Sequence, residues 1–340
     1  MTRLRVPSTP GLRRRQVLQL GGVLGLTALA GCTRGASAPL LQAASEILPS
    51  LWRRRLPRPW RFEPLELAGG SGVPPWRVDR SADLLALSDG WLPTTTDADF
   101  QPIAAAPLQA RLAGQARRYL ELLGAERASR VLPVAVTPWV MLFRGLDGLD
   151  GASERGWQLL LDPDFKGQVV LPASPRLVME LADQIPGTES LARLRSAALT
   201  LDDQQGLNWL LQGKARVAVL PLQRCIQALR RDPRLRAVLP DSGAPLHWTL
   251  LMRPASSREP LPQAWVEDAW GTPLLRPLLG RGWRPPLADE LLDAQRDAIP
   301  ASFRALVLPT AAVWARCWSL SPLKTAAAEQ LSQRWRDAAP

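Results

Sequence analysis

The chain has 340 residues, enough for one large domain or for two lobes of ordinary size. Its formal net charge at pH 7 is +11, but only three of its 42 basic residues are lysines. Such a bias is typical of a GC-rich genome, so the charge predicts a solvated arginine-rich surface rather than a nucleic-acid site. The single histidine and the single tyrosine exclude a histidine-rich zinc site and a paired-tyrosine iron site.

The first 31 residues are predicted to be an export leader. They carry five arginines and no acid, and their apolar segment, residues 17–30, is too short to cross a membrane as a helix. The end of this segment, Leu29-Ala30-Gly31-Cys32, resembles the lipobox of bacterial lipoproteins. That resemblance implies cleavage before Cys32 and a diacylglyceryl group on its thiol. The alternative is an ordinary signal peptide followed by a chance cysteine.

The pair Arg14-Arg15 also resembles a twin-arginine export signal, although any export signal has a basic start. Removing the leader would leave 309 residues with a net charge of +6, because the leader holds five positive charges. The remaining charge would add some attraction to anionic lipid near the anchor. Cys225 and Cys317 would either pair or stay apart, and we expect two separately buried thiols.

Residues 32–44 are small and polar enough for a tether between lipid and folded body. Beyond them, short apolar runs alternate with amphipathic segments, which predicts an α/β fold with layered helices and sheet. Strands are expected over 83–87, 131–143 (broken at Thr137-Pro138), 169–171, 217–220 and 246–252. Helices are expected over 107–123, after Ser174-Pro175, over 207–212 and 222–231, and throughout the chain beyond residue 260.

Four stretches in chain order resemble the extracellular solute-binding proteins of ABC importers, in particular the spermidine/putrescine-binding type. They are ADLLALSDGWLPTTTDADFQPI (82–103), VLPVAVTPWVMLFR (131–144), WQLLLDPDFKGQVVLPASPR (157–176) and the pair LLQGKARVAVLPLQ with DSGAPLHWTLLMRP (210–223, 241–254). The third stretch is the most specific, because its Trp, Asp-Pro, Phe-Lys-Gly and Pro-Arg fall at the family's spacing. The resemblance covers roughly residues 80–285.

The resemblance implies a two-lobed periplasmic-binding-protein type 2 fold, with crossing hinge strands and a ligand cleft. We expect the first lobe over 45–137 and 250–300, and the second over 138–249 and 301–340. It further implies a small-molecule solute, delivery to an ABC permease in the membrane, no catalysis and no cofactor. The expected protein is a periplasmic monomer, anchored through lipidated Cys32 so that it stays near its permease, and without nucleic acid as a partner.

The first candidate ligand-binding residues follow the strand at 83–87, since loops after the carboxyl ends of strands line such clefts. They are Ser88, Asp89 and Trp91. Asp89 is expected to receive a ligand amine and Trp91 to stack on it. The alternative places Asp89 at a helix cap and Trp91 in the core. Trp139, just after Thr137-Pro138, is a further candidate wall of the cleft or a core residue.

The second group of candidates lies farther along the chain. Ser174 begins a helix whose free N–H groups favour an anion or a neutral acceptor, unless the serine only caps the helix. Arg176 would bridge the lobes or bind a carboxylate, with a surface ion pair as the alternative. The last three candidates are Gln223, His247 and Trp248. The alternative for Gln223 is a solvent-exposed position at the start of a helix, and the alternative for Trp248 is a core position on a strand.

The polyamine ligand itself is not predicted. Where the family supplies acids, this chain has Thr249, Ala173, Ser174 and Leu177, and it has Pro221 where the family supplies a tryptophan. A divalent amine without carboxylates loses its hydration at high cost. A less charged amine, an amino acid derivative or an anionic solute is therefore an open alternative.

Three other classes of protein are alternatives to a solute-binding protein. A serine hydrolase would have to use His247, and no G-x-S-x-G elbow appears; the Gly69–Gly72 turn lacks the lysine of a phosphate loop. A protein that captures ferric iron would need a pair of tyrosines, and this chain has only Tyr119. A degenerate pair of lobes that serves as a scaffold or sensor lipoprotein, without cargo, remains the alternative function.

Overall fold

The computed structural model describes residues 38–44, 46–65, 81–145, 148–323 and 325–339. Cys32, the leader and most of the expected tether lie outside these residues. Residues 39–340 form a compact unit of their own. Among the residues that the structure describes, no helix is both long and apolar enough to cross a membrane.

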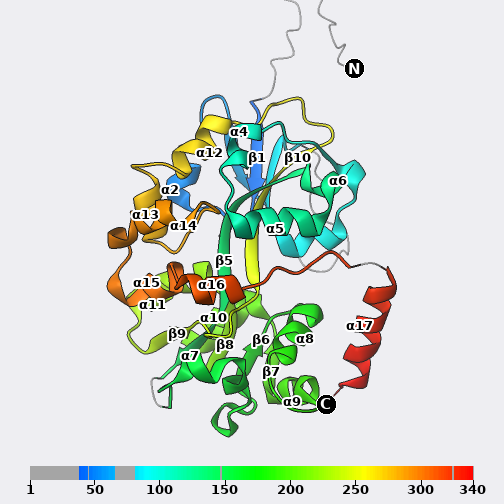
Figure 1. Cartoon of the computed structure of the whole chain (residues 1–340), viewed down its shortest axis with the longest axis vertical. Coiled ribbons are helices and arrows are strands. Elements are labelled where there is room, and N and C mark those ends of the chain that lie inside the picture. The colour runs from blue at the N-terminus through cyan, green and yellow to red at the C-terminus, as the bar shows by residue number, and fades with distance from the viewer. Residues whose placement is uncertain (1–37, 45, 66–80, 146–147, 324, 340) are drawn as a thin grey trace, which may run out of the picture. The chain divides into compact units, whose positions relative to one another are not determined.

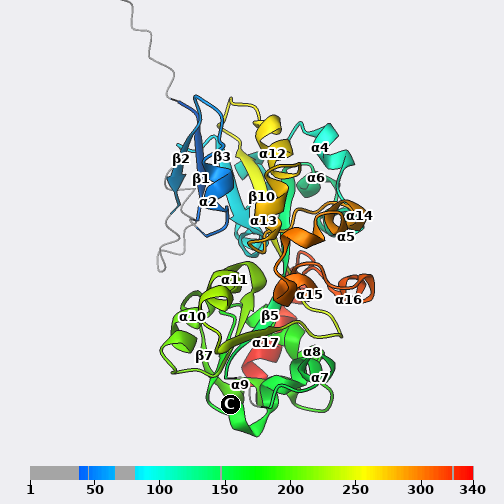
Figure 2. The ribbon, with the colours of Figure 1, turned by 90° about the vertical axis from the view of Figure 1, so that its left-hand side faces the viewer.

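The first lobe is built on a sheet in the order β2-β1-β3-β10-β5. Strand β1 runs parallel to β2 and β3, and β10 lies antiparallel between β3 and β5. The strands are β1 Leu40–Ala43, β2 Arg61–Pro64, β3 Leu84–Ser88, β4 Phe100–Gln101 beside the end of β10, β5 Val131–Arg144 and β10 Leu246–Pro254. Helices cover the sheet (Figures 1 and 2), which explains why β3 is a continuous buried apolar run.

The helices of the first lobe are short. They are α2 Ser50–Arg53, α4 Ala106–Ala110, α5 Gly114–Leu123, α6 Ala125–Ala128, α12 Gln263–Ala269, α13 Leu275–Leu279 and α14 Asp289–Asp293, with 3₁₀ turns at Asp89–Thr94, Asp97–Asp99 and Arg296–Ala298. One helix over 107–123 was expected, but the chain breaks between α4 and α5. The break has a tertiary cause, because the extended Ala113 donates its N–H to the carbonyl of Pro286 at 2.8 Å.

The tether is shorter than expected. Residues 40–43 form the buried strand β1 rather than the end of a tether over 32–44. This strand was not predicted from the sequence, because a pattern of four residues is too short to identify a strand and its neighbours are small and polar. Its pairing with both β2 and β3 is what holds it in the sheet.

The second lobe continues the same sheet with the strands β8, β6 and β7, and β9 pairs with the end of β5. The strands are β6 Val169–Leu171, β7 Ala198–Leu201, β8 Val217–Pro221 and β9 Leu235–Val238. Its helices are α7 Ala152–Arg155, α8 Pro175–Asp183, α9 Ser190–Ala197, α10 Asp203–Leu211, α11 Leu222–Arg231 and α17 Thr325–Asp337, with 3₁₀ turns at Gly156–Leu161 and Pro163–Phe165. The strands expected over 169–171 and 217–220 and the helix over 222–231 are confirmed.

Strand β5 belongs to both lobes. Its residues 131–138 pair with β10, and its residues 139–144 pair with β8 and β9. The break expected at Thr137-Pro138 is wrong, because the strand runs through it without interruption. Pro138 has no N–H to offer, but it lies where the strand leaves β10 for β8, so the sheet tolerates it there.

Two further segments link the lobes. The first segment runs from β9 of the second lobe into β10 of the first. The second segment follows the 3₁₀ turn at Ala301–Phe303 and contains α15 (Arg304–Val307) and α16 (Ala311–Arg316). They touch where the N–H of Leu246 donates to the carbonyl of Trp318 at 2.7 Å. All of β10 pairs with strands of the first lobe, so residues 246–249 lie in that sheet rather than beyond the expected border at 249/250. The lobe boundaries otherwise stay a prediction.

Paired tryptophans fix the core of the first lobe. The rings of Trp52 on α2 and Trp265 on α12 stack at 4.2 Å, and each indole N–H donates to the backbone carbonyl of the other residue. Both polar groups are thereby satisfied inside the core. Cys225 and Cys317 are both free and buried, which confirms the expectation of two separate thiols.

Candidate functional site

Asp89 lies at the junction of two neighbouring strands. It follows β3 directly, and Ser88 at the end of β3 lies opposite Thr249 of β10. This register brings the Asp89 Oδ1 to the start of β10, where it accepts the backbone N–H of Trp248 at 3.1 Å. The same oxygen lies 3.7 Å from Nδ1 of His247. The antiparallel pairing thus joins two candidates that are far apart in sequence.

Burial controls the charge of Asp89. Its side chain is only 13% exposed, and burial raises the pKa of its carboxyl to about 7. Backbone N–H groups of Trp248, Asp89 itself and Gly90, followed by the charge of Arg176, act in the opposite direction. A carboxyl near its titration point at neutral pH is easily ionised by an approaching cation. Asp89 is thus suited to hold an amine.

His247 and Trp139 form a neutral aromatic surface beside Asp89. Burial, and to a smaller degree the charge of Arg224, lowers the pKa of His247 to about 4. The imidazole is therefore uncharged at pH 7, and its proximity to Asp89 is not a strong ion pair. The ring of Trp139 meets it edge-on, with centroids 5.8 Å apart and planes at 90°. Such a surface packs well against the apolar part of a solute.

Arg176 contributes a positive charge from the second lobe. Burial lowers the pKa of its guanidinium, whereas the charges of Glu180 and Asp89 raise it. Its Nε is buried and has no hydrogen-bond partner among the described residues; Glu180 is 4.0 Å away. The charge of Arg176 on α8 lowers the pKa of Asp89 at the end of β3, and the charge of Asp89 raises that of Arg176. One acid and one guanidinium leave this group of residues close to neutral.

Two candidates make structural bonds instead. Ser174 is exposed, and its Oγ accepts the N–H of Leu177 at 3.3 Å, as a helix N-cap does. The Nε2 of Gln223 donates to the carbonyls of Glu46 at 3.0 Å and Ile47 at 2.9 Å. Gln223 therefore joins α11 of the second lobe to the loop after β1 in the first.

The remaining two candidates pack inward. Trp248 is fully buried, its ring stacks on Tyr119 at 4.6 Å, and its indole N–H donates to Ser319 Oγ at 2.9 Å. Alternation along β10 points Trp248 away from the face that carries His247. Trp91 is half-buried and packs against the core. Both positions agree with the core alternative.

Two residues that sequence analysis missed also link the lobes. Arg224 places its Nε 3.2 Å from a carboxylate oxygen of Glu46 and its Nη1 3.3 Å from Asp203. Asp203 in turn accepts the N–H of Ala173 at 2.9 Å. Arg224 follows the carboxyl end of β8, so the rule that selected Asp89 could have found it. Glu46 was missed because β1 was taken for part of the tether.

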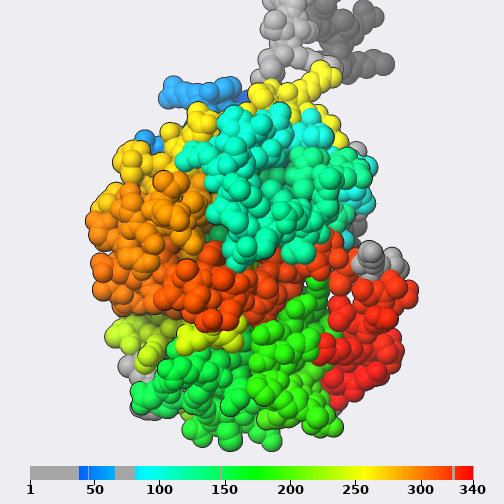
Figure 3. Space-filling view, in the orientation of Figure 1, coloured from blue at the N-terminus to red at the C-terminus, as the bar shows by residue number. Residues whose placement is uncertain are grey.

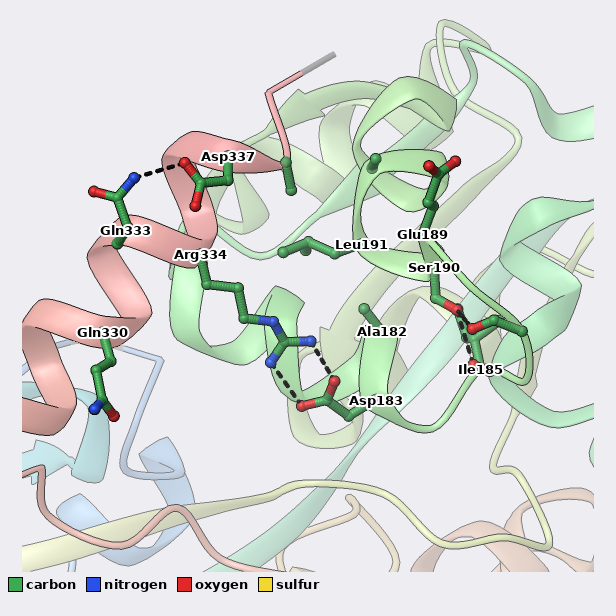
Figure 4. Close-up of a pocket in the computed structure, with 13 residues that line it drawn as sticks. Ala182, Asp183, Ile185, Glu189, Ser190, Leu191, Gln330, Gln333, Arg334 and Asp337 are labelled. Atoms are coloured by element: carbon green, nitrogen blue, oxygen red, sulfur yellow. Dashed lines mark hydrogen bonds and ion pairs between the residues drawn. The ribbon is translucent and has the colours of Figure 1, made fainter.

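A cavity of about 760 Å³ lies elsewhere in the second lobe, between α17 and the helices α8 and α9 (Figure 4). It contains the ion pair of Asp183 with Arg334, whose Nη1 lies 3.0 Å from the carboxylate. None of the candidate residues lines it, so it is separate from the predicted site. Among the residues described, no group of three or more His, Cys, Asp or Glu side chains could hold a metal ion.

Comparison with known proteins finds no matching family model and no matching curated protein. Solved structures do match. A spermidine/putrescine ABC transporter substrate-binding protein from Streptococcus pneumoniae superposes with a TM-score of 0.65 at 11% identity, over 88% of this chain and 98% of that one. A periplasmic thiamin binding protein gives 0.61 at 14% identity, over 89% and 96%. A lipoprotein of Treponema pallidum gives 0.57 at 12% identity, over 88% and 99%.

At such low identity the likeness concerns the fold. The chain has the two-lobed fold of periplasmic binding proteins, as the four sequence stretches predicted. The first of these structures is named as an ABC transporter substrate-binding protein and the second as a periplasmic binding protein, and neither is named as an enzyme.

Proposed function

We propose that the protein is an exported lipoprotein that binds a small solute between its lobes and delivers it to an ABC permease. The observation that supports this best is the contact of Asp89 with His247 in the first lobe, together with the electrostatic influence between Asp89 and Arg176 of the second lobe. A solute held by groups on both lobes binds the closed state better than the open one, which is the condition for ligand-driven closure.

The charges of the site favour a monoamine or a zwitterion over a polyamine. Asp89 offers one carboxylate to one ammonium group, and the neutral His247 and Trp139 offer packing surface. A second ammonium would meet Arg176 rather than an acid, so its lost hydration would go uncompensated. A carboxylate on the solute would instead match the unbonded Nε of Arg176.

The contacts between the lobes suit reversible closing and opening. Gln223 and Arg224 reach the loop after β1 through polar bonds that are partly exposed to solvent. Exposed bonds of this kind contribute modestly and re-form easily in water. The closed form therefore depends on the solute for most of its preference over the open form.

Export and anchoring rest on the leader and on the lipobox-like residues before Cys32. One solved structure of similar fold is itself a lipoprotein. Labelling the expressed chain with radioactive palmitate tests the anchor. Incorporation that disappears in Cys32→Ser supports it, whereas unlabelled wild-type protein overturns it. The leader variant Arg14→Lys/Arg15→Lys separates the two export routes, since only twin-arginine export requires both arginines.

A thermal-shift screen tests the binding function. Monoamines, zwitterionic amino acid derivatives, organic anions and polyamines are compared on wild type and Asp89→Asn. At a concentration 100 times Kd, a ligand stabilises the protein by about 2.7 kcal/mol, a shift of several degrees in Tm. A hit that is lost in Asp89→Asn supports the proposal. Stabilisation by spermidine overturns the ligand class, and the absence of any hit favours the scaffold or sensor alternative.

A further inference from the structure

A cluster of arginines projects from the first lobe. The arginine surface consists of Arg54, Arg55, Arg58 and Arg61, on the end of α2, the following loop and the start of β2. All four are exposed. Arg61 lies 3.7 Å from Glu63, whereas the other three have no ion-pair partner among the described residues. Concentrated positive charge of this kind attracts a negative partner.

The arginine surface also carries apolar side chains. Leu56 and Trp60 lie between the arginines and are half-exposed. Arg53 next to them is half-buried, with its guanidinium carbon 4.5 Å from the ring centre of Phe62 and its Nε buried without a hydrogen-bond partner. Basic residues interleaved with Trp and Leu are typical of surfaces that rest on lipid headgroups.

The fold places the arginine surface where the chain enters the first lobe. The backbone N–H of Arg61 donates to the carbonyl of Pro39 at 2.8 Å, and Arg61 lies opposite Leu40 in the β1–β2 register. The segment appears in blue at the top of Figure 1, and Figure 3 shows it on the surface there. The arginine surface and the point where the chain enters the first lobe therefore lie at the same end of that lobe.

Chain length then limits how far this end can stand from a membrane. Six residues lie between Cys32 and Pro39, and the seven Cα–Cα steps that join the two positions span at most about 25 Å when fully extended. A lipid on Cys32, as proposed above, keeps the arginine surface within a few Debye lengths of the headgroups. The argument rests on that proposed anchor.

We propose that the arginine surface binds anionic phospholipid headgroups and so orients the anchored protein on its membrane. Guanidinium groups bind phosphate in two-pronged fashion, and Trp60 and Leu56 enter the headgroup layer. The lipid anchor supplies attachment, and the arginine surface supplies orientation. Arg61 lies at the amino end of β2, whereas Asp89 of the proposed solute site follows the carboxyl end of β3. Headgroups bound at the arginine surface would therefore leave the solute site open.

The test uses a polypeptide of residues 33–340, which contains the whole compact unit but no lipid. Its sedimentation with phosphatidylglycerol vesicles and with phosphatidylcholine vesicles is measured for wild type, for Arg54→Gln/Arg55→Gln/Arg58→Gln, and for a control of equal charge. The control is Arg193→Gln/Arg231→Gln/Arg236→Gln, three exposed arginines of the second lobe without ion-pair partners among the described residues.

Wild type and control are expected to bind phosphatidylglycerol vesicles, and high salt is expected to release them. Each arginine contributes about fivefold in partitioning, so the surface variant binds on the order of 100-fold more weakly. Equal loss in both variants overturns the proposal in favour of net charge alone, as does absence of binding by wild type. A surface variant that binds vesicles normally but no longer binds the permease assigns the surface to a protein partner instead. Palmitate labelling and the thermal-shift screen report independently on the anchor and the solute site.

Discussion

Oδ1 of Asp89 accepts the backbone N–H of Trp248 at 3.1 Å while lying 3.7 Å from Nδ1 of His247. The two strand ends are thereby fastened through a side chain that is also the only acid among the candidate ligand-binding residues. The bond leaves Asp89 oriented but still near its titration point, because burial opposes its ionisation. The same carboxyl thus holds the two strand ends together and is the group that we propose binds the solute.

Stability is expected to depend on pH through Asp89. Its pKa is about 7 in the folded state and near 3.8 when unfolded, so the folded state binds the extra proton between these values. Stability from this group is complete below about pH 3.8 and is lost as pH rises toward 7. The variant Asp89→Asn should lack this fall, as measured by Tm between pH 4 and 8. An identical pH profile for wild type and variant contradicts the raised pKa.

His247 is expected to act in the opposite direction. Its pKa falls from 6.5 to about 4 on folding, so the unfolded state binds the extra proton as pH drops. Its contribution is present above about pH 6.5 and is lost as pH falls toward 4. His247→Gln should remove this loss in the same Tm series, and the double variant with Asp89→Asn separates the two effects. A steeper acid loss in His247→Gln than in wild type is the contrary outcome.

A cationic solute should bind with an affinity that increases with pH through Asp89. Below pH 7 the carboxyl must first release its proton, so affinity falls about tenfold per pH unit there. In Asp89→Asn the affinity at pH 8 should drop 10- to 100-fold, the range for a hydrogen bond to a charged group. Calorimetric titration at pH 5.5, 7 and 8 measures both. A pH-independent affinity would assign the amine to another acceptor.

Removing the Gln223 side chain should loosen the closed form. Gln223→Ala deletes both bonds to the loop after β1, so the dissociation rate of bound solute should rise several-fold. Stopped-flow displacement measures this rate. Gln227→Ala, an exposed position one turn farther along α11, is the matched control and should leave it unchanged. Equal rates in all three proteins would show that the contact plays no part in closure.

The two buried thiols should resist reagents in the folded protein. Burial raises the pKa of Cys225 to about 12 and that of Cys317 to about 11, so neither carries a reactive thiolate at pH 8. Ellman's reagent should find no thiol in folded residues 33–340 and two after unfolding. If unfolding without reductant reveals none, the thiols are paired and the assignment of free cysteines is wrong.

The sequence predicted most of the second lobe because its signals are local. Each of three predictions depended only on residues adjacent in sequence, and the structure confirms each one. They are the strand over 217–220, the helix over 222–231 and the helix cap at Ser174. Elements that depend on distant partners were harder to predict. β1 is a strand only because β2 and β3 pair with it, and the break after α4 depends on Pro286.

The candidate site shows the same division. Asp89 was predicted from its place after a strand and Arg176 from its place in the helix that Ser174 begins, and the charges of the two residues influence each other's pKa. Their role in binding stays a prediction. Sequence could not decide between ligand wall and core for Trp248, because strand register determines which side of β10 meets Tyr119. Glu46 could not be paired with Arg224 while β1 was unrecognised.

Strand β5 has a consequence for dissecting the molecule. A single backbone supplies hydrogen bonds to β10 on one side of Pro138 and to β8 and β9 on the other. A gene fragment that ends inside it would leave one partner with a bare, aggregation-prone edge. We therefore expect the two lobes to unfold in one cooperative transition, and we expect neither lobe to fold when it is expressed alone.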